Sequence, residues 1–148
     1  MQNSETQISA LTPESIPEIF PLAERFHQEF GYRGTFDREA FFNHWEAQIL
    51  NGDGTVLVAE VDEKIVGTIG YSQTIDQFNG WPTTLVSFWY VDRELRRGLL
   101  GARLLHIMEE HQRDCGSKRI LIGHPNSSQY TLHHAGFESI ETGYEKVI

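Results

Sequence analysis

The sequence has a single cysteine, few basic residues and no long apolar run, and each shortage excludes a class of protein. With Cys115 alone, no disulfide can form within the chain, and a reducing, cytoplasmic compartment is expected. No apolar stretch approaches the roughly 18 residues that span a bilayer, and the polar N-terminus does not resemble a secretory signal. Twelve Lys and Arg against 21 Asp and Glu give a formal net charge of −9, which disfavours nucleic acid as a partner.

A chain of 148 residues, 39% hydrophobic and 22% charged, has the size and composition of one soluble domain. Segments typical of strands and of helices alternate along it, without repeats or low-complexity tracts. The pattern predicts one α/β domain over residues 1–148, with a sheet covered by helices. Strands are expected at 8–11, 55–61, 64–72, 83–91, 118–123, 137–141 and 144–148, and helices at 13–30, 37–50, 98–115 and 126–135.

Two of these segments contain residues that predict local irregularity. Pro17 and Pro21 fall inside the first helical stretch, so we expect that helix to be bent or broken. Gly67 and Gly70 interrupt the strand at 64–72, which indicates a bulge or a close approach of another group to the backbone.

The sharpest chemical signal is the turn between the strand at 83–91 and the helix that follows it. This turn, Arg96–Ala102, reads RRGLLGA. A strand that enters a helix through such a turn directs several backbone N–H groups toward one point, and the helix dipole adds positive potential there. Arg96 and Arg97 increase that potential, although two surface arginines at the start of a helix are the simpler alternative. The turn therefore predicts an anion site, most naturally for phosphate.

The longer segment Val91–Ala102, VDRELRRGLLGA, resembles the acetyl-CoA signature of the GNAT N-acetyltransferases, in the form seen in small phage-type and bacterial members. In that family a strand ending in valine is followed by Arg/Gln-x-x-Gly-x-Gly/Ala and then a helix. Arg96 and Gly101 match the first and last positions, but Leu99 stands where the middle glycine is usual. Two further matches extend the resemblance over roughly the whole chain, Val66-Gly67 and Gly136-Phe137.

The resemblance implies a mixed, mostly antiparallel sheet with helices on both faces and a splayed strand pair, 83–91 and 118–123, that forms a wedge for acetyl-CoA. It also implies an N-acetyltransferase that needs no metal and moves acetyl to a primary amine of a small molecule or peptide. A backbone N–H near Val91 would polarise the thioester carbonyl. The residues expected to contact acetyl-CoA are Trp89, Tyr90, Val91, Arg96, Arg97, Gly98, Leu99, Leu100, Gly101, Ala102 and Asn126.

Leu99 bears directly on whether this site can hold phosphate. A backbone amide donates a hydrogen bond whatever its side chain, but a conformation with positive φ would be costly for leucine. The alternative to an enzyme is therefore a weak or inactive module that binds acetyl-CoA or a partner without turnover.

The residue that would protonate the departing thiolate is ambiguous by one position. The family pattern Asn-x-x-Ala-x-x-Leu-Tyr-x-x-x-Gly-Phe corresponds to residues 126–137, which are one residue shorter. Counting from Asn126 places His133 at the tyrosine position, whereas counting back from the Gly-Phe pair places Leu132 there, which cannot transfer a proton. His133 is the first candidate acid and Tyr130 the second, and protonation by water is the alternative.

The residue that would accept the proton of the amine is also undecided, because the strand at 83–91 carries no carboxylate. Asp76 and His124 are candidates by their positions, and a dedicated base need not exist. No histidine or cysteine spacing indicates a metal site.

The loop between the first two helices would cover the acceptor in the resembled family. That places Phe30, Tyr32 and Arg33 near the substrate, with core packing and a solvated loop as the simpler alternatives. The negative net charge mildly favours a cationic acceptor, and solubility alone explains it equally well. Exposed strand edges and Trp81 leave a homodimer open.

Overall fold

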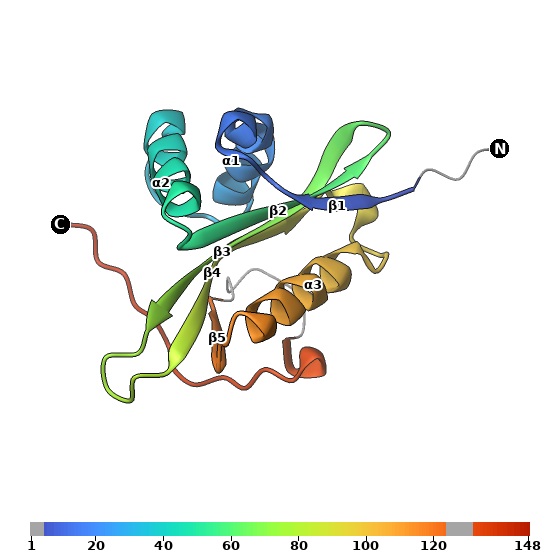
Figure 1. The fold of residues 1–148 in the computed structure, drawn as a ribbon. Helices are drawn as coiled ribbons and strands as arrows, with labels where there is room; N and C mark the ends of the chain where they lie inside the picture. Colours follow the sequence, from blue (N-terminus) through green and yellow to red (C-terminus); the bar gives the residue numbers. More distant parts are fainter. Residues whose placement is uncertain (1–4, 124–131) are drawn as a thin grey trace.

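The computed structural model describes residues 5–123 and 132–148, and its centre is a five-stranded sheet in the order β1-β2-β3-β4-β5 (Figure 1). Neighbouring strands are antiparallel except β4 and β5, which are parallel. Helices α1 and α2 lie on one face and α3 on the other, so the predicted mixed sheet covered on both faces is confirmed. The elements are β1 (Gln7–Ala10), η1 (Pro13–Ile19), α1 (Phe20–Glu29), α2 (Arg38–Leu50), β2 (Gly54–Val61), β3 (Lys64–Ile75), β4 (Pro82–Val91), η2 (Arg93–Leu95), α3 (Leu100–Asp114), β5 (Arg119–Ile122) and η3 (Leu132–Ala135).

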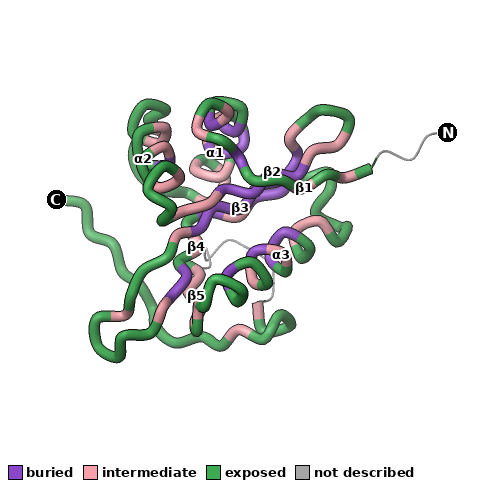
Figure 2. The backbone as a smooth tube through the Cα atoms, in the orientation of Figure 1, coloured by how far each residue is buried: buried purple, intermediate pink, exposed green. Residues whose placement is uncertain are grey.

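Each face of the sheet has its own hydrophobic core, because successive residues of a strand point to opposite faces. In β2, Val56 and Val58 belong to the core beneath η1 and α2, whereas Leu57 and Ala59 belong to the core that includes Leu104 of α3. Figure 2 shows this arrangement as buried segments along the middle strands and on the sheet-facing sides of the helices. The central sheet is therefore buried on both faces.

The first helical stretch is broken, as its prolines predicted. Residues Pro13–Ile19 form a 3-10 helix that contains Pro17, and the α-helix begins only at Phe20 with Pro21 in its first turn. The next helix begins where predicted, with the Asp37 carboxylate accepting a hydrogen bond from Ala40 N at 3.0 Å.

A β-bulge in β4 is the main irregularity of the sheet. Gly70 lies opposite Phe88 and Tyr71 lies opposite Val86, so Ser87 is the extra residue on β4. As a result Val86 packs against the α3-side core and Phe88 lies in the α1–α2-side core, although residues two apart on a regular strand share a face. A β-carbon on Gly70 would overlap the Phe88 ring, so the close approach predicted at this glycine is confirmed.

The strands predicted at 137–141 and 144–148 are wrong. No residue from 137 to 148 is in a strand, and those from 138 onward are all exposed (Figure 2). Local β propensity does not make a strand without a neighbour to pair with, and β5 pairs only with β4 among the described residues. Of the helix predicted at 126–135, the described part is the short 3-10 helix η3.

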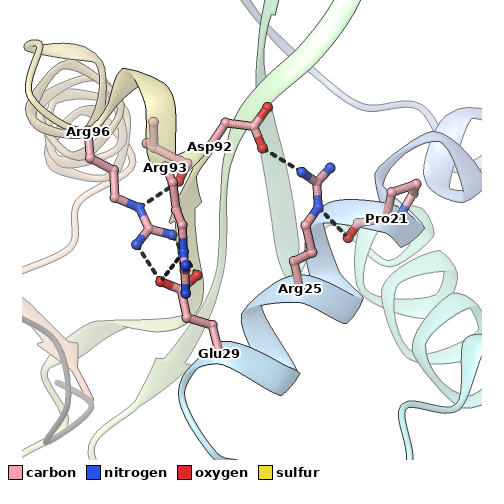
Figure 3. Close-up of polar contacts among 7 residues, drawn as sticks. Pro21, Arg25, Glu29, Asp92, Arg93 and Arg96 are labelled. Carbon is pink, nitrogen blue, oxygen red and sulfur yellow. Dashed lines mark hydrogen bonds and ion pairs between the residues drawn. The ribbon is translucent and has the colours of Figure 1, made fainter.

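Charged side chains join α1 to the end of β4 and the residues after it (Figure 3). Glu29 of α1 accepts hydrogen bonds from both terminal nitrogens of Arg96, with Arg96 Nη2 at 2.7 Å, and also pairs with Arg93. One turn earlier on α1, Arg25 Nη1 lies 2.9 Å from Asp92 Oδ1. The Glu29 side chain is only 15% exposed, so these contacts fix α1 against the turn that precedes α3.

The Arg96 guanidinium has a large effect on the Glu29 carboxyl. Its hydrogen bonds outweigh partial burial and, with help from Tyr90 and Arg93, lower the pKa of Glu29 from 4.5 to about 2. Because the folded pKa is depressed, the stabilisation is present above pH 4.5 and is lost as pH falls toward 2.

Replacing Gly70 by alanine is expected to lower the free energy of unfolding by about 1–3 kcal/mol, because the Phe88 ring must move to admit the methyl group. Urea unfolding at neutral pH measures the change. Gly143→Ala is the matched control, since nothing lies within 4 Å of a β-carbon there. Equal stability of the two variants would contradict the close approach.

Replacing Glu29 by glutamine is expected to cost about 1–3 kcal/mol of unfolding free energy at pH 7, because Arg96 loses its charged partner. The wild-type advantage should shrink between pH 4.5 and pH 2, as the wild-type carboxyl takes up its proton. Glu24→Gln, on the same helix and paired with Arg38 at 3.4 Å in a more exposed position, is the control. If the difference in unfolding free energy between the wild type and the Glu29 variant stayed the same down to pH 2, the Glu29–Arg96 ion pair would be ruled out as its cause.

Candidate active site

The candidate site lies along the part of β4 that extends beyond the end of its parallel neighbour β5. The two strands pair from Thr83 opposite Arg119 to Val86 opposite Ile122, and β4 then runs on to Val91. The last five residues of β4 therefore extend past the paired part of β5. This is the arrangement that the predicted wedge between these strands requires.

The backbone of Val91 faces the open side of β4. Asp92 N donates to Val66 O of the adjoining segment at 2.8 Å, so Val91, opposite Gly67, occupies a non-hydrogen-bonded pair of the antiparallel ladder. Its N–H and C=O consequently point away from β3. The contact of Arg96 Nε with Val91 O, at 2.8 Å, agrees with this direction. An N–H donor thus lies on the open edge at the position expected for polarising a carbonyl.

The turn into α3 accommodates Leu99 without strain. Leu99 is the N-cap residue of α3 with φ −95° and ψ 5°, and its side chain is 83% exposed. No side chain caps the helix, so the first-turn N–H groups of Leu100, Gly101 and Ala102 have no acceptor within the helix. The leucine therefore leaves the predicted anion site open.

Trp89 fixes the position of that helix start. Its indole Nε1 donates to Gly101 O at 3.1 Å, and a β-carbon on Gly101 would meet the same ring at 3.5 Å. Trp89 thus packs onto the first turn of α3 from β4, and small residues at position 101 fit beneath it.

The two turn arginines differ in their surroundings. Arg96 is held by Val91 O and by Glu29, and its guanidinium lies 4.9 Å from the centre of the Tyr90 ring. Arg97 is exposed and makes no ion pair with any residue that the structure describes. Arg97 is therefore the arginine available to an anion, and Glu29 is a partner that the sequence did not reveal.

A cavity of about 410 Å³ lies on the α1–α2 face, against the bulge of β4. Tyr32 and Arg33, both predicted near the acceptor, line it, and Ser87 connects it to the bulge. Phe30 does not line it but contacts the rings of Phe26 and Tyr90. The remaining lining residues are Ala23, Phe26, His27, Phe36, Phe41, His44, Trp45, Phe88 and Glu145.

The cavity carries little charge. Among its lining residues Glu145 is the single carboxylate, and its Oε1 lies 2.8 Å from Arg33 Nε. His27 Nε2 lies 3.2 Å from Arg33 O, and desolvation raises the pKa of Tyr32. His27 and His44 gave no signal in the sequence, because a histidine among apolar residues of a helix has the same spacing whether it borders a core or a cavity.

Of the predicted acid and base residues, the two that the structure describes, His133 and Asp76, do not line this cavity. His133 is exposed on η3, whose neighbour Leu132 packs against the α3-side core. The Asp76 carboxylate accepts hydrogen bonds from Phe78 N and Asn79 N in the β3–β4 loop and pairs with Arg119, which lowers the pKa of Asp76. Asp76 therefore stabilises its own loop. Three other predicted residues lie outside the described ranges, His124, Asn126 and Tyr130.

Neither a metal cluster nor a spanning helix is found in residues 5–123 and 132–148. No group of three or more His, Cys, Asp or Glu side chains there could hold a metal ion. No helix in these ranges has the length and apolar character needed to cross a membrane.

Comparison with known proteins agrees with this geometry. A predicted acetyltransferase of Clostridium acetobutylicum, solved with acetyl-CoA, has a TM-score of 0.85 at 11% identity over 97% of this chain and 96% of that one. The aminoglycoside N-acetyltransferase AAC(6')-Iy with CoA gives 0.81 at 16% identity, over 99% and 96%. Glucosamine-6-phosphate N-acetyltransferase of Arabidopsis thaliana gives 0.76 at 16% identity, over 97% and 98%. No curated protein matches by sequence.

The family model for the Acetyltransferase (GNAT) family matches residues 16–137, which include the wedge strands, the arginine turn and α3. The match covers most of the chain and agrees with the fold of the solved structures. The chain belongs to the GNAT family of acetyltransferases.

Proposed function

We propose that the protein is an N-acetyltransferase that moves acetyl from acetyl-CoA to a primary amine by direct attack. The observation that carries this proposal is the convergence of three features on β4. Its open edge presents the Val91 N–H, its end leads into the uncapped start of α3, and its bulge borders the cavity. Family membership and relatives solved with acetyl-CoA or CoA support the choice of donor.

Acetyl-CoA would supply an activated thioester, so the protein's task is to bind, orient and stabilise charge. The first-turn N–H groups of α3 and the Arg97 side chain would hold the pyrophosphate. Arg96 would act indirectly, because its bonds to Glu29 and Val91 O fix the turn and the end of β4 together.

The reaction forms a C–N bond between the amine and the acetyl carbon and breaks the C–S bond of the thioester. The Val91 N–H would donate to the carbonyl oxygen as negative charge develops there. The amine loses a proton and the departing sulfur gains one. His133 remains our first candidate for the acid and Tyr130 the second, while His27 and His44 are the histidines that border the amine side.

Calorimetric titration tests the proposal. Both acetyl-CoA and the unreactive desulfo-CoA should bind, and thiol release from acetyl-CoA should depend on an added amine. Replacing Arg97 by alanine is expected to weaken both affinities about 10-fold, or about 1.4 kcal/mol, because one charge-assisted phosphate contact is lost.

Arg113→Ala is the matched control, since it removes the same charge from the far end of α3. Binding of neither ligand to the wild type would overturn the proposed function. Binding without amine-dependent thiol release would indicate a module that holds acetyl-CoA without turnover. Equal affinities of the Arg97 and Arg113 variants would remove Arg97 from the phosphate site.

Replacing His133 by alanine is expected to lower the turnover number about 100-fold or more, the usual contribution of a general acid, with unchanged acetyl-CoA affinity. His134→Ala is the control, because it is the adjacent exposed histidine of the same 3-10 helix. Full activity of the His133 variant would mean that Tyr130 or water protonates the thiolate.

A further inference from the structure

We infer that the acceptor is a small primary amine carried on an aromatic body, which the ring-lined cavity on the α1–α2 face receives. This inference rests on the proposed function, and it assigns the substrate class that the family match leaves open. It depends on the walls of the cavity, on its charge and on its position against β4.

The walls are aromatic rings from four different parts of the chain. Phe26 of α1 and Tyr32 of the following loop lie 5.3 Å apart between ring centres, at an angle of 30°. Trp45 of α2 and Phe88 of β4 lie 5.4 Å apart at 84°. Trp45 and Phe88 are buried, at 2% and 7% exposed, and support the wall from beneath. The more exposed rings of Tyr32 and Phe36 offer the apolar surface that an aromatic ligand contacts by stacking and edge contacts.

The charge of the described lining disfavours acceptors with several ammonium groups. A polyamine or an aminoglycoside needs several carboxylates to replace lost hydration, and the lining residues that the structure describes include one, Glu145. Glu145 is already paired with Arg33, and both side chains are more than 60% exposed at the rim. A single ammonium group, by contrast, can lie against the faces of aromatic rings.

The position of the cavity orients the amine. Ser87, the extra residue of the β4 bulge, lines it, and the next residues of β4 are those that extend past β5 toward Val91. An aromatic body seated among the rings therefore places an amine on a short linker at the bulge. A cavity of about 410 Å³ suits such a molecule, since small-ligand pockets span roughly 300–1,000 Å³.

Tyr32 and Phe36 are the best residues to change, because both line the cavity and neither belongs to the cores of buried residues. Tyr32→Ala and Phe36→Ala should each raise the KM for tryptamine about 10-fold, with little change in the turnover number or in acetyl-CoA affinity. Tyr32→Phe should restore the wild-type KM. Tyr144→Ala, which removes a 94% exposed ring beside Glu145 that does not line the cavity, is the matched control.

The test compares tryptamine and 2-phenylethylamine with putrescine, spermidine and kanamycin, by calorimetric binding and by thiol release with acetyl-CoA. Both aromatic amines should bind to the wild type, and their kcat/KM should exceed that of every polycation about 10-fold or more. Preference for a polycation with normal acetyl-CoA binding would overturn the inference and leave the proposed function standing.

Two other outcomes are also decisive. Failure of the protein to bind acetyl-CoA would overturn the proposed function. In that case, calorimetric titration with tryptamine would still test the cavity, since absence of tryptamine binding would overturn the inference as well. A peptide with N-terminal phenylalanine that is acetylated far better than tryptamine would overturn the assignment to a small molecule.

Discussion

The single extra residue at Ser87 is the constraint on which the arrangement of the site depends. Because of this extra residue, the side chains of Val86 and Phe88 point to opposite faces of the sheet. Val86 joins the α3-side core, and Phe88 joins the rings on the α1–α2 face. Beyond it, Trp89 holds the start of α3 from one face while Phe88 borders the cavity on the other. One strand therefore connects the cavity with the turn into α3, and Gly70 opposite the bulge leaves the space that the Phe88 ring requires.

Helix α1 adds a second connection between the same two halves. Its Phe26 and His27 border the cavity, and its Arg25 and Glu29 bind the residues that follow β4. The Glu29–Arg96 pair is only partly exposed, so water screens it less than a pair on the open surface. A displacement of α1 would have to break these charged contacts as well as the ring packing. Helix α1 thus holds the cavity and the turn before α3 in a fixed relation to each other, as the proposed acceptor and donor regions require.

The sequence predicted what depends on neighbours along the chain. The β-branched run of β4, the prolines of the first helix and Gly70 each have a local physical cause, and the structure has the corresponding feature. Contacts between distant residues gave no such signal: Glu29 and Arg96 are 67 positions apart. The aromatic residues of α1 and α2 have helical spacing whether their rings fill a core or border a cavity. The C-terminal segment shows the converse error, since its β propensity was local and none of the strands that the structure describes pairs with it.

The separation of the cavity from η3 limits how protons can be handled. The cavity lies on the face of α1 and α2, whereas Leu132 of η3 packs on the α3 side. In the proposed site, a group on η3 would act on the departing sulfur, and a different group or solvent would take the proton of the incoming amine. The amine side offers His27, His44 and open solvent, and an amine seated on aromatic rings is itself partly desolvated. Ring faces attract the ammonium form, so in the proposed site its proton would have to pass to His27, His44 or solvent once the amine lies at the bulge.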